Sequence, residues 1–482
     1  MPDNNGTADT APNGKADWIE LFRGGRGVYT VLSNLGIGLH ALDIFIIITI
    51  MPTVVTDIGG LAYYTWTSML YMVGSITGAA CGGYMRIQLG RRRGYVIAGI
   101  VLIVGTVGCA IPPDMPTLLG ARVIKGFGGG LVIAQSMALI SELYDNRLRT
   151  RMLALVTTTW SVAALLGPAI GGVFAEIGWW RGAFWATLPF TVVFVWASWR
   201  TIPPSPPSAI SRPLPLMRLS LLTLGVICVG MTGQMDSIPA MGVMLFAALA
   251  LVWFTFRVDA TSDHALFPSR PLSFFGAVGL SYWVFFLISV THSSLLIFTP
   301  LFLQVLHGLS PLYVGYLSLV FSLAWTAGAI AVSGWTGRWE RYAAAGGMGL
   351  AAVGIALMTR EIVSGSMTVV TVYFMVIGLG IGATNVLMTS WGMMVARKGE
   401  ESVTASSMPM IRAIGVAFGA ALAGLVANAA GLGQGTEREI VANAAIWVMS
   451  MSVVPPALAA LIALRFLTYW HGGHESVGAA RD

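Results

Sequence analysis

A single acidic residue stands inside a long apolar run near the start of the chain. Asp43 is followed by Ile-Phe-Ile-Ile-Ile-Thr-Ile-Met-Pro52, and His40 lies three residues before it. An ionised group at membrane depth costs at least about 2.5–3.5 kcal/mol, so a carboxylate kept there is expected to have a function. It could carry a proton, and a histidine one helical turn away could relay it. Asp43 and His40 are therefore the predicted proton-coupling residues, with an ordinary hydrogen bond as the alternative role for His40.

Three basic residues also lie within apolar stretches. Arg122 and Lys125 are three positions apart and so share one face of a helix, and Arg412 begins the segment Arg-Ala-Ile-Gly-Val-Ala-Phe-Gly. With Asp43 ionised, the fixed interior charge is positive, which disfavours permanently cationic solutes in a medium of low dielectric constant. These residues predict substrate binding or charge pairing, and a neutral or anionic solute. For Arg412 the alternative is a structural role in which its side chain snorkels to the cytoplasmic end.

A further group of polar side chains in apolar stretches could orient a ligand or bond helices to one another. These are Asn34, Gln135, His292, Gln304 and Asn385. The apolar stretches contain no cluster of His, Glu and Cys that would form a metal site or an activated nucleophile, and the three cysteines have no paired spacing. We therefore expect neither an enzyme nor a bound metal or cofactor.

The elements that must position these residues are expected to be membrane helices. The 482 residues are 56% hydrophobic and 10% charged, whereas soluble domains contain about 25% charged residues. Continuous apolar runs favour helices over the alternating strands of a barrel, and each can supply the roughly 20 residues that cross a bilayer. Fourteen spans are predicted, at about 28–55, 62–86, 94–112, 116–141, 151–174, 182–202, 216–234, 238–256, 272–306, 311–334, 342–359, 365–392, 402–430 and 441–468.

The basic residues predict the orientation of these spans. If the N-terminus is cytoplasmic, only Arg181, Arg360 and Arg438 of the 27 Lys and Arg fall in loops on the outer side. This asymmetry is the positive-inside pattern. We expect a multi-pass protein of the inner (plasma) membrane with both termini cytoplasmic, in contact with the lipid bilayer and without a nucleic-acid partner or an obligate protein partner.

The distribution of proline divides the chain. The segment 203–215 is rich in proline, which breaks helices, and is interpreted as a cytoplasmic linker. The predicted organisation is a disordered tail at 1–27, six spans at 28–202, the linker, two inserted spans at 216–270, six further spans at 271–469 and a tail at 470–482.

Four stretches resemble the major facilitator superfamily, and within it the fourteen-span drug:proton antiporter branch. The run from Asp43 to Pro52 is similar to the first-helix pattern of that branch, and Arg122-Val-Ile-Lys125-Gly is similar to its helix 4 pattern, with Lys in place of Gln. The third is Gly83-Tyr-Met-Arg-Ile87-Gln88-Leu-Gly90-Arg91-Arg92, which resembles the basic loop after helix 2, although Ile87 and Gln88 replace its acidic residue and the following Arg. The fourth is Gly167-Pro168-Ala-Ile-Gly171-Gly172, which resembles the antiporter motif of helix 5.

The resemblance implies an all-α major facilitator fold, with two six-helix bundles and two inserted helices, fourteen transmembrane helices in all. It implies transport of a small organic solute by alternating access, with a site near the midplane, and structural or gating roles for the glycines, Pro168 and the loop arginines. Asp43 would then be either a proton carrier or a structural partner of Arg122. Proton-coupled export of drugs or metabolites is the leading hypothesis. Uptake of a planar aromatic nutrient, such as the vitamin riboflavin, is the alternative.

Overall fold

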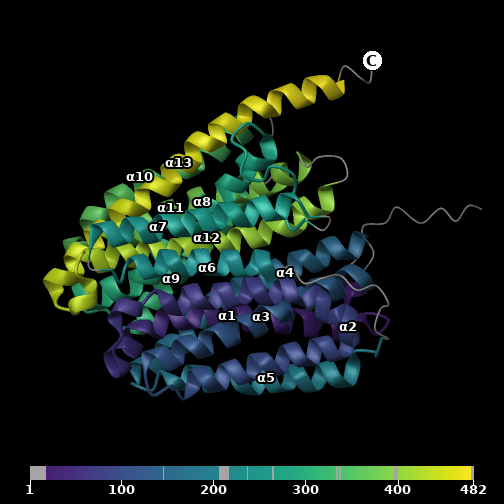
Figure 1. The fold of residues 1–482 in the computed structure, drawn as a ribbon, viewed down its shortest axis with the longest axis horizontal. Helices are drawn as coiled ribbons and strands as arrows, with labels where there is room; N and C mark the ends of the chain where they lie inside the picture. The colour runs from purple at the N-terminus through teal and green to yellow at the C-terminus, as the bar shows by residue number, and fades with distance from the viewer. Residues whose placement is uncertain are drawn as a thin grey trace, which may run out of the picture.

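The computed structural model describes residues 18–144, 146–205, 216–235, 237–262, 265–332, 335, 338–395 and 400–478. Within these residues the regular structure is helical throughout (Figure 1). Its elements are η1 (Trp18–Leu21), α1 (Arg26–Ile58), η2 (Leu61–Tyr63), α2 (Trp66–Ala110), α3 (Met115–Leu143), α4 (Asn146–Glu176), α5 (Arg181–Thr201), α6 (Leu216–Thr232), α7 (Ile238–Ala260), α8 (Ala277–His307), α9 (Pro311–Val332), α10 (Arg338–Ser364), α11 (Met367–Met394), α12 (Glu401–Ala429), η3 (Leu432–Gln434) and α13 (Arg438–Gly478).

The number of helices differs from the predicted fourteen. The described residues form thirteen α-helices, of which twelve are long and apolar enough to cross a membrane. Two expected spans lie in the one helix α2, and the expected span at 216–234 is α6, which has only 17 residues. Hydropathy locates apolar runs, but it does not show whether the polar residues between two runs interrupt the helix.

Helix α2 changes direction at Gly90, where the backbone leaves the helical region at φ 78° and ψ 168°. The arms 66–89 and 91–110 both pack on α3 around residues 127 and 128. A methyl group added at Gly78 would lie 2.1 Å from the carbonyl oxygen of Phe127, and one added at Gly128 would lie 2.5 Å from the backbone nitrogen of Leu102. The second arm therefore returns alongside the first.

The helices form two sets that meet along α4 and α9 and along α2 and α12. In Figure 1, α1, α2, α3 and α5 of the first helix set lie in the lower part of the molecule, α8, α10, α11, α12 and α13 of the second helix set lie in the upper part, and α4 and α9 lie between them. Pro168 and Gly172 of α4 lie against α9. A methyl group added at Gly172 would come within 2.7 Å of α9, and one added at Gly315 of α9 would come within 2.7 Å of α4. Gly167 and Gly171 instead face α1. The predicted glycine-proline segment is therefore a packing surface for two neighbouring helices.

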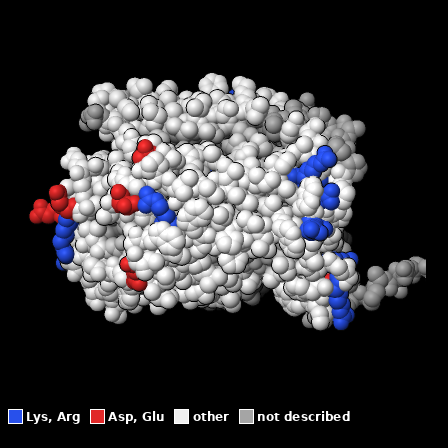
Figure 2. All heavy atoms as spheres, turned by 90° about the horizontal axis from the view of Figure 1, so that it is seen from below, with Lys and Arg blue, Asp and Glu red and all other residues white. Residues whose placement is uncertain are grey.

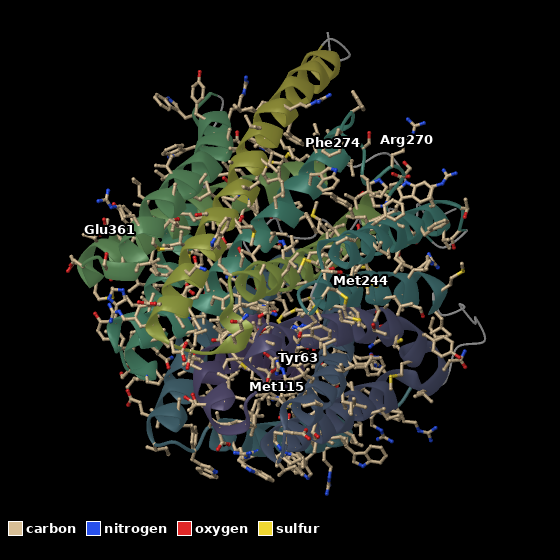
Figure 3. The ribbon with its side chains drawn as sticks, turned by 60° about the vertical axis from the view of Figure 1, so that its left-hand side comes forward. Tyr63, Met115, Met244, Arg270, Phe274 and Glu361 are labelled. Atoms are coloured by element: carbon tan, nitrogen blue, oxygen red, sulfur yellow. The ribbon has the colours of Figure 1, made fainter. Side chains whose placement is uncertain are left out.

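The remaining contacts between the sets lie at the end that carries η2 and η3. The rings of Tyr64 and Phe298 stack at 5.2 Å, and the side-chain amide of Asn428 donates to the carbonyl of Ala62 at 2.9 Å. Figure 3 shows Tyr63 and Met115 near each other at this end, and a methyl group added at Gly60 would lie 2.7 Å from Met115. Here Asp114 caps α3 by accepting from the Thr117 amide at 2.9 Å, and this hydrogen bonding lowers the pKa of the Asp114 carboxyl.

The ends of the predicted segments differ slightly in the structure. Residues 18–21 of the expected tail form η1, whose Leu21 is buried, and α13 extends to Gly478. Residues 1–17, 206–215 and 479–482, which include most of the predicted tail and linker, lie outside the described residues. The face seen in Figure 2 is largely uncharged along its middle; most of its basic side chains lie toward the right-hand end, and the acidic side chains lie mainly toward the left, some beside basic ones.

Candidate functional site

The predicted acid lies in a three-residue charge cluster between α1 and α3. The carboxylate of Asp43 contacts the guanidinium of Arg122 through one oxygen and the ammonium of Lys125 through the other. The exposed fractions of the three side chains are 2%, 0% and 3%. The cluster is therefore sealed within the first helix set, and its formal charge is one positive unit.

Small residues allow the backbones to approach closely enough for this contact. A methyl group added at Gly126 would lie 2.1 Å from the carbonyl oxygen of Tyr71, and one added at Gly129 would lie 2.5 Å from Nδ1 of His40. Any larger side chain would separate α3 from α1 and α2. The glycines that follow Lys125 in the sequence are thus what places its ammonium against Asp43.

Neutral groups contact both cations of the cluster. Arg122 Nε donates to the Thr67 carbonyl at 3.0 Å, its guanidinium lies 4.2 Å from the centre of the Tyr71 ring, and Lys125 Nζ lies 4.5 Å from the centre of the Phe184 ring. Such cation–π contacts lower the cost of burying a cation. Arg122 Nη2 has no hydrogen-bond partner among the described residues.

His40 reaches the cluster through Tyr71 rather than through Asp43. Its Nδ1 lies 2.8 Å from the Tyr71 hydroxyl, and the two rings stack at 5.3 Å. The other side of the imidazole meets the edge of Trp160, with ring centres 6.2 Å apart. The chain of contacts therefore runs from His40 to Tyr71 to Arg122, and then to Asp43.

Arg412 and Asn385 form a second site, within the second helix set. Arg412 Nη2 donates to Oδ1 of Asn385 at 2.7 Å and to Oγ1 of Thr389 at 3.1 Å, both on α11. The guanidinium lies 5.1 Å from the centre of the Phe285 ring on α8. Arg412 is thus held between α8, α11 and α12 by neighbouring helices. His292 lies against Trp325 and Phe321, at ring-centre distances of 5.3 and 5.8 Å.

Two further predicted amides, Asn34 and Gln135, bond neighbouring helices. Asn34 donates to the Thr30 carbonyl at 2.8 Å and accepts from the Thr159 hydroxyl at 2.7 Å. Gln135 donates to the Gly82 carbonyl at 2.9 Å and accepts from Arg86 at 3.3 Å. Each amide has both a donor and an acceptor contact within the protein.

The predicted basic loop is the bend of α2. A methyl group at Gly90 would lie 2.3 Å from the Ser205 carbonyl oxygen, whereas nothing lies within 4 Å of one at Gly83. Arg91 bonds Glu142 of α3 at 3.3 Å, and Arg86 pairs with the same carboxylate. The guanidinium of Arg92 lies 4.6 Å from the centre of a Trp199 ring. These contacts tie the bend to α3 and α5.

A cavity of about 320 Å³ lies between α1 and α8, close to the end that carries η3. Its lining consists of Pro52, Thr53, Val55, Thr56, Leu301, Gln304, Val305 and Thr436. Gln304 is the one polar residue singled out from the sequence that borders it. The charge cluster lies deeper in the first helix set and does not contribute to this lining.

Two features of the interior were not predicted. Arg218 of α6 pairs with Asp259 of α7, and Asp259 also accepts from the backbone amides of Leu266 and Phe267. The sequence placed Asp259 at a helix end and gave no sign of its burial. In addition, the Ala62 carbonyl accepts from Gln234 at 3.0 Å as well as from Asn428. The residue type gives no indication that a backbone carbonyl will accept hydrogen bonds from distant side chains.

Comparison with known proteins identifies the family. The model of the Major Facilitator Superfamily matches residues 34–420. A Mycobacterium tuberculosis protein named "Probable multidrug-efflux transporter" is 30% identical over 432 residues, which cover 86% of this chain and 91% of the relative. The "Multidrug transporter protein MdtP" of Bacillus subtilis is 26% identical, over 81% of this chain and 73% of the relative.

Solved structures agree in fold. The crystal structure of a D-xylose-proton symporter has a TM-score of 0.65 at 16% identity and covers 91% of this chain and 97% of its own. A bacterial homologue of the human lysosomal transporter Spinster, in an inward-facing conformation, has a TM-score of 0.62 at 15% identity and covers 92% and 97%. The protein is therefore a multi-pass membrane transporter rather than an enzyme, and it belongs to the major facilitator superfamily.

Proposed function

We propose that this protein exports small organic solutes in exchange for protons, and that Asp43 is the group that carries the proton. The observation that supports this most directly is the burial of Asp43 against two cations. A structural ion pair needs one cation, and replacing a buried pair by apolar residues is often neutral or stabilising. Burying one carboxylate with two cations leaves one positive charge uncompensated. This costs free energy that helix packing alone does not require.

The proposed mechanism gives each member of the cluster a role. Uptake of a proton by Asp43 removes its negative charge and loosens its hold on Arg122 and Lys125. The two cations are then left to repel each other in a medium of low dielectric constant, so protonation changes the electrostatic energy of the α1–α3 contact. A hydrogen bond joins His40 to Tyr71, whose ring faces the guanidinium of Arg122, so this pair lies beside the cluster and would respond to its change of charge.

We further propose fourteen membrane crossings with both termini cytoplasmic. The return of α2 at Gly90 supports counting its arms as two crossings. Helix α6 is about 26 Å long at 1.5 Å per residue, close to the thickness of the hydrocarbon layer. The basic side chains at one end of Figure 2 are those expected on the cytoplasmic side.

Transport by alternating access would then start from the conformation of this structure. The contacts between the two helix sets at Ala62, Tyr64 and Gly172 lie at the end assigned to the outer side. This supports a state closed to the outside. Exchange of solute would require these contacts to break while contacts form at the opposite end.

The direction of transport is inferred from the relatives. The names of both bacterial relatives describe multidrug transport, and one describes efflux, which favours export. Uptake of a planar aromatic nutrient remains the alternative because the fixed charge is positive and Ile87 and Gln88 interrupt the basic loop. In both cases the solute is expected to be neutral or anionic.

Solute-dependent proton flux in proteoliposomes tests the proposal. Vesicles containing the purified protein and an internal pH-sensitive dye would be challenged with a panel of neutral, anionic and cationic aromatic solutes. Antiport predicts that entering solute drives protons out and raises the internal pH. Internal acidification with solute entry would support uptake by symport, and solute entry without any proton movement would contradict proton coupling.

A further inference from the structure

Arg412 differs from the buried residues Arg122 and Arg218 because no acidic side chain among the described residues pairs with it. Arg122 pairs with Asp43, and Arg218 pairs with Asp259. Among the described residues, Arg412 takes part in no ion pair, and its hydrogen bonds go to a neutral amide and a hydroxyl. An arginine that is not neutralised at membrane depth is costly, and such residues mark ion or substrate sites.

The position of Arg412 makes it accessible to a solute. The residue lies deep among α8, α11 and α12, yet part of its side chain remains accessible, as do Asn385, Thr389 and His292. Asp43, Arg122 and Lys125 are sealed by comparison, so a solute can reach the positive charge of Arg412 but not that of the cluster.

The donors of Arg412 are arranged for a carboxylate. Nη2 is fixed by Asn385 and Thr389, so the plane of the guanidinium is held, and the ring of Phe285 lies 5.1 Å from its centre. A planar guanidinium in a fixed orientation can donate to both oxygens of a carboxylate at once. The ammonium of a lysine, which acts as a point charge, lacks this geometric match. One excess positive charge balances one negative charge, which favours a monoanion over a dianion such as phosphate.

Aromatic side chains lie next to this charge. His292 lies two helical turns after Phe285 on the same face of α8, and it contacts Trp325 at a ring-centre distance of 5.3 Å and Phe321 at 5.8 Å. His292 and Trp325 are both partly accessible. Flat aromatic surfaces of this kind are suited to stacking against an aromatic ring.

We propose that Arg412, with Asn385 and Thr389, binds the carboxylate of an aromatic monoanion whose ring lies toward His292 and Trp325. The inference rests on the proposed function only in that the bound anion is the transported solute. It makes Arg412 a determinant of specificity, while Asp43 remains the proton carrier.

The test compares two ligands of equal shape in the purified full-length protein. Binding of 1-naphthoate and of its uncharged counterpart 1-naphthamide would be measured by calorimetry in lipid nanodiscs. A hydrogen-bonded charge predicts a preference of about tenfold or more for the carboxylate in the unmodified protein. Arg412→Gln should abolish this preference, Arg412→Lys should retain part of it, and Arg360→Gln, at an exposed arginine of α10, should leave it unchanged.

Equal affinity of the unmodified protein for both ligands, or a preference that survives Arg412→Gln, would overturn the proposal. The comparison on the unmodified protein decides the question even if Arg412→Gln does not fold. Failure of this proposal is distinguishable from failure of the proposed function. Without the carboxylate preference, proton-coupled transport of neutral solutes could still be observed, and a carboxylate preference without any solute-driven proton flux would refute only the transport mechanism.

Discussion

Asp43 on α1 contacts Arg122 on α3 although 79 positions separate the two residues in the chain. The contact forms because the glycines after Lys125 bring α3 against α1 and α2. It joins the buried acid of α1 to two cations of α3 in a sealed interior. The stability of the first helix set and its proposed proton chemistry therefore depend on the same side chains.

Removing the acid alone should destabilise the protein strongly. Asp43→Asn leaves Arg122 and Lys125 as two buried cations without a counter-ion, and breaking a buried pair costs about 3–5 kcal/mol. The double variant Asp43→Asn/Lys125→Gln has the same formal charge as the unmodified cluster and should recover most of the lost stability. Thermal unfolding of the purified proteins measures both. An Asp43→Asn variant as stable as the unmodified protein would contradict the electrostatic description of the cluster.

Gly90 and Gly83 belong to one sequence motif but should respond differently to substitution. Gly90→Ala places a side chain at φ 78° and 2.3 Å from the Ser205 carbonyl oxygen. The left-handed backbone alone costs about 1–2 kcal/mol, so the unfolding temperature should fall. Gly83→Ala has nothing within 4 Å and is the matched control. Equal responses of the two variants would show that α2 does not bend at Gly90 as described.

The close contact between α2 and α3 can be tested in the same way. Gly126→Ala would place a methyl group 2.1 Å from the Tyr71 carbonyl oxygen, so the helices must separate, at a cost of about 1–3 kcal/mol. Gly120→Ala on the same helix meets nothing within 4 Å and should be neutral or slightly stabilising. Thermal unfolding again provides the measurement, and a stable Gly126→Ala variant would argue against the packing of α2 on α3.

The Ala62 carbonyl joins three parts of the molecule, because Gln234 lies between α6 and α7 and Asn428 lies on α12. Replacing Gln234 or Asn428 by alanine removes one hydrogen bond to the Ala62 carbonyl. Each replacement should therefore increase hydrogen exchange at the backbone N–H groups of residues 61–65. Asn443→Ala removes a similar bond, to the Ala430 carbonyl at 3.0 Å, without touching Ala62, and should leave this exchange unchanged. Unaltered exchange in both Gln234→Ala and Asn428→Ala would mean that the junction does not hold the outer end closed.

The sequence was sufficient for the helical membrane fold because apolar length and basic-residue asymmetry act locally. It also indicated the partners in the charge cluster, since a buried Asp requires a counter-ion and few cations occur in apolar stretches. The shape of α2, two helical arms joined by a bend at Gly90, was not predictable in this way. The basic residues around Gly90 are compatible with either helix or loop, and packing on α3 and contact with Ser205 determine the outcome.

Other features depend on contacts between distant backbones. Three features follow from how helices cross: the contacts of Arg122 with Tyr71 and of Lys125 with Phe184, the burial of Asp259, and the acceptor role of the Ala62 carbonyl. Hydropathy carries no information on these crossings. The structure also places Arg412 against Asn385 and Thr389, and neither residue is close to it in the sequence.

The most direct test of the central claim is solute-driven proton flux in proteoliposomes that contain the double variant Asp43→Asn/Lys125→Gln. Its formal charge matches that of the unmodified cluster, so loss of flux would not simply reflect an additional buried charge. If Asp43 carries the proton, the double variant should exchange labelled solute across the membrane with no accompanying proton movement. Proton flux at the level of the unmodified protein would show that Asp43 does not carry the proton.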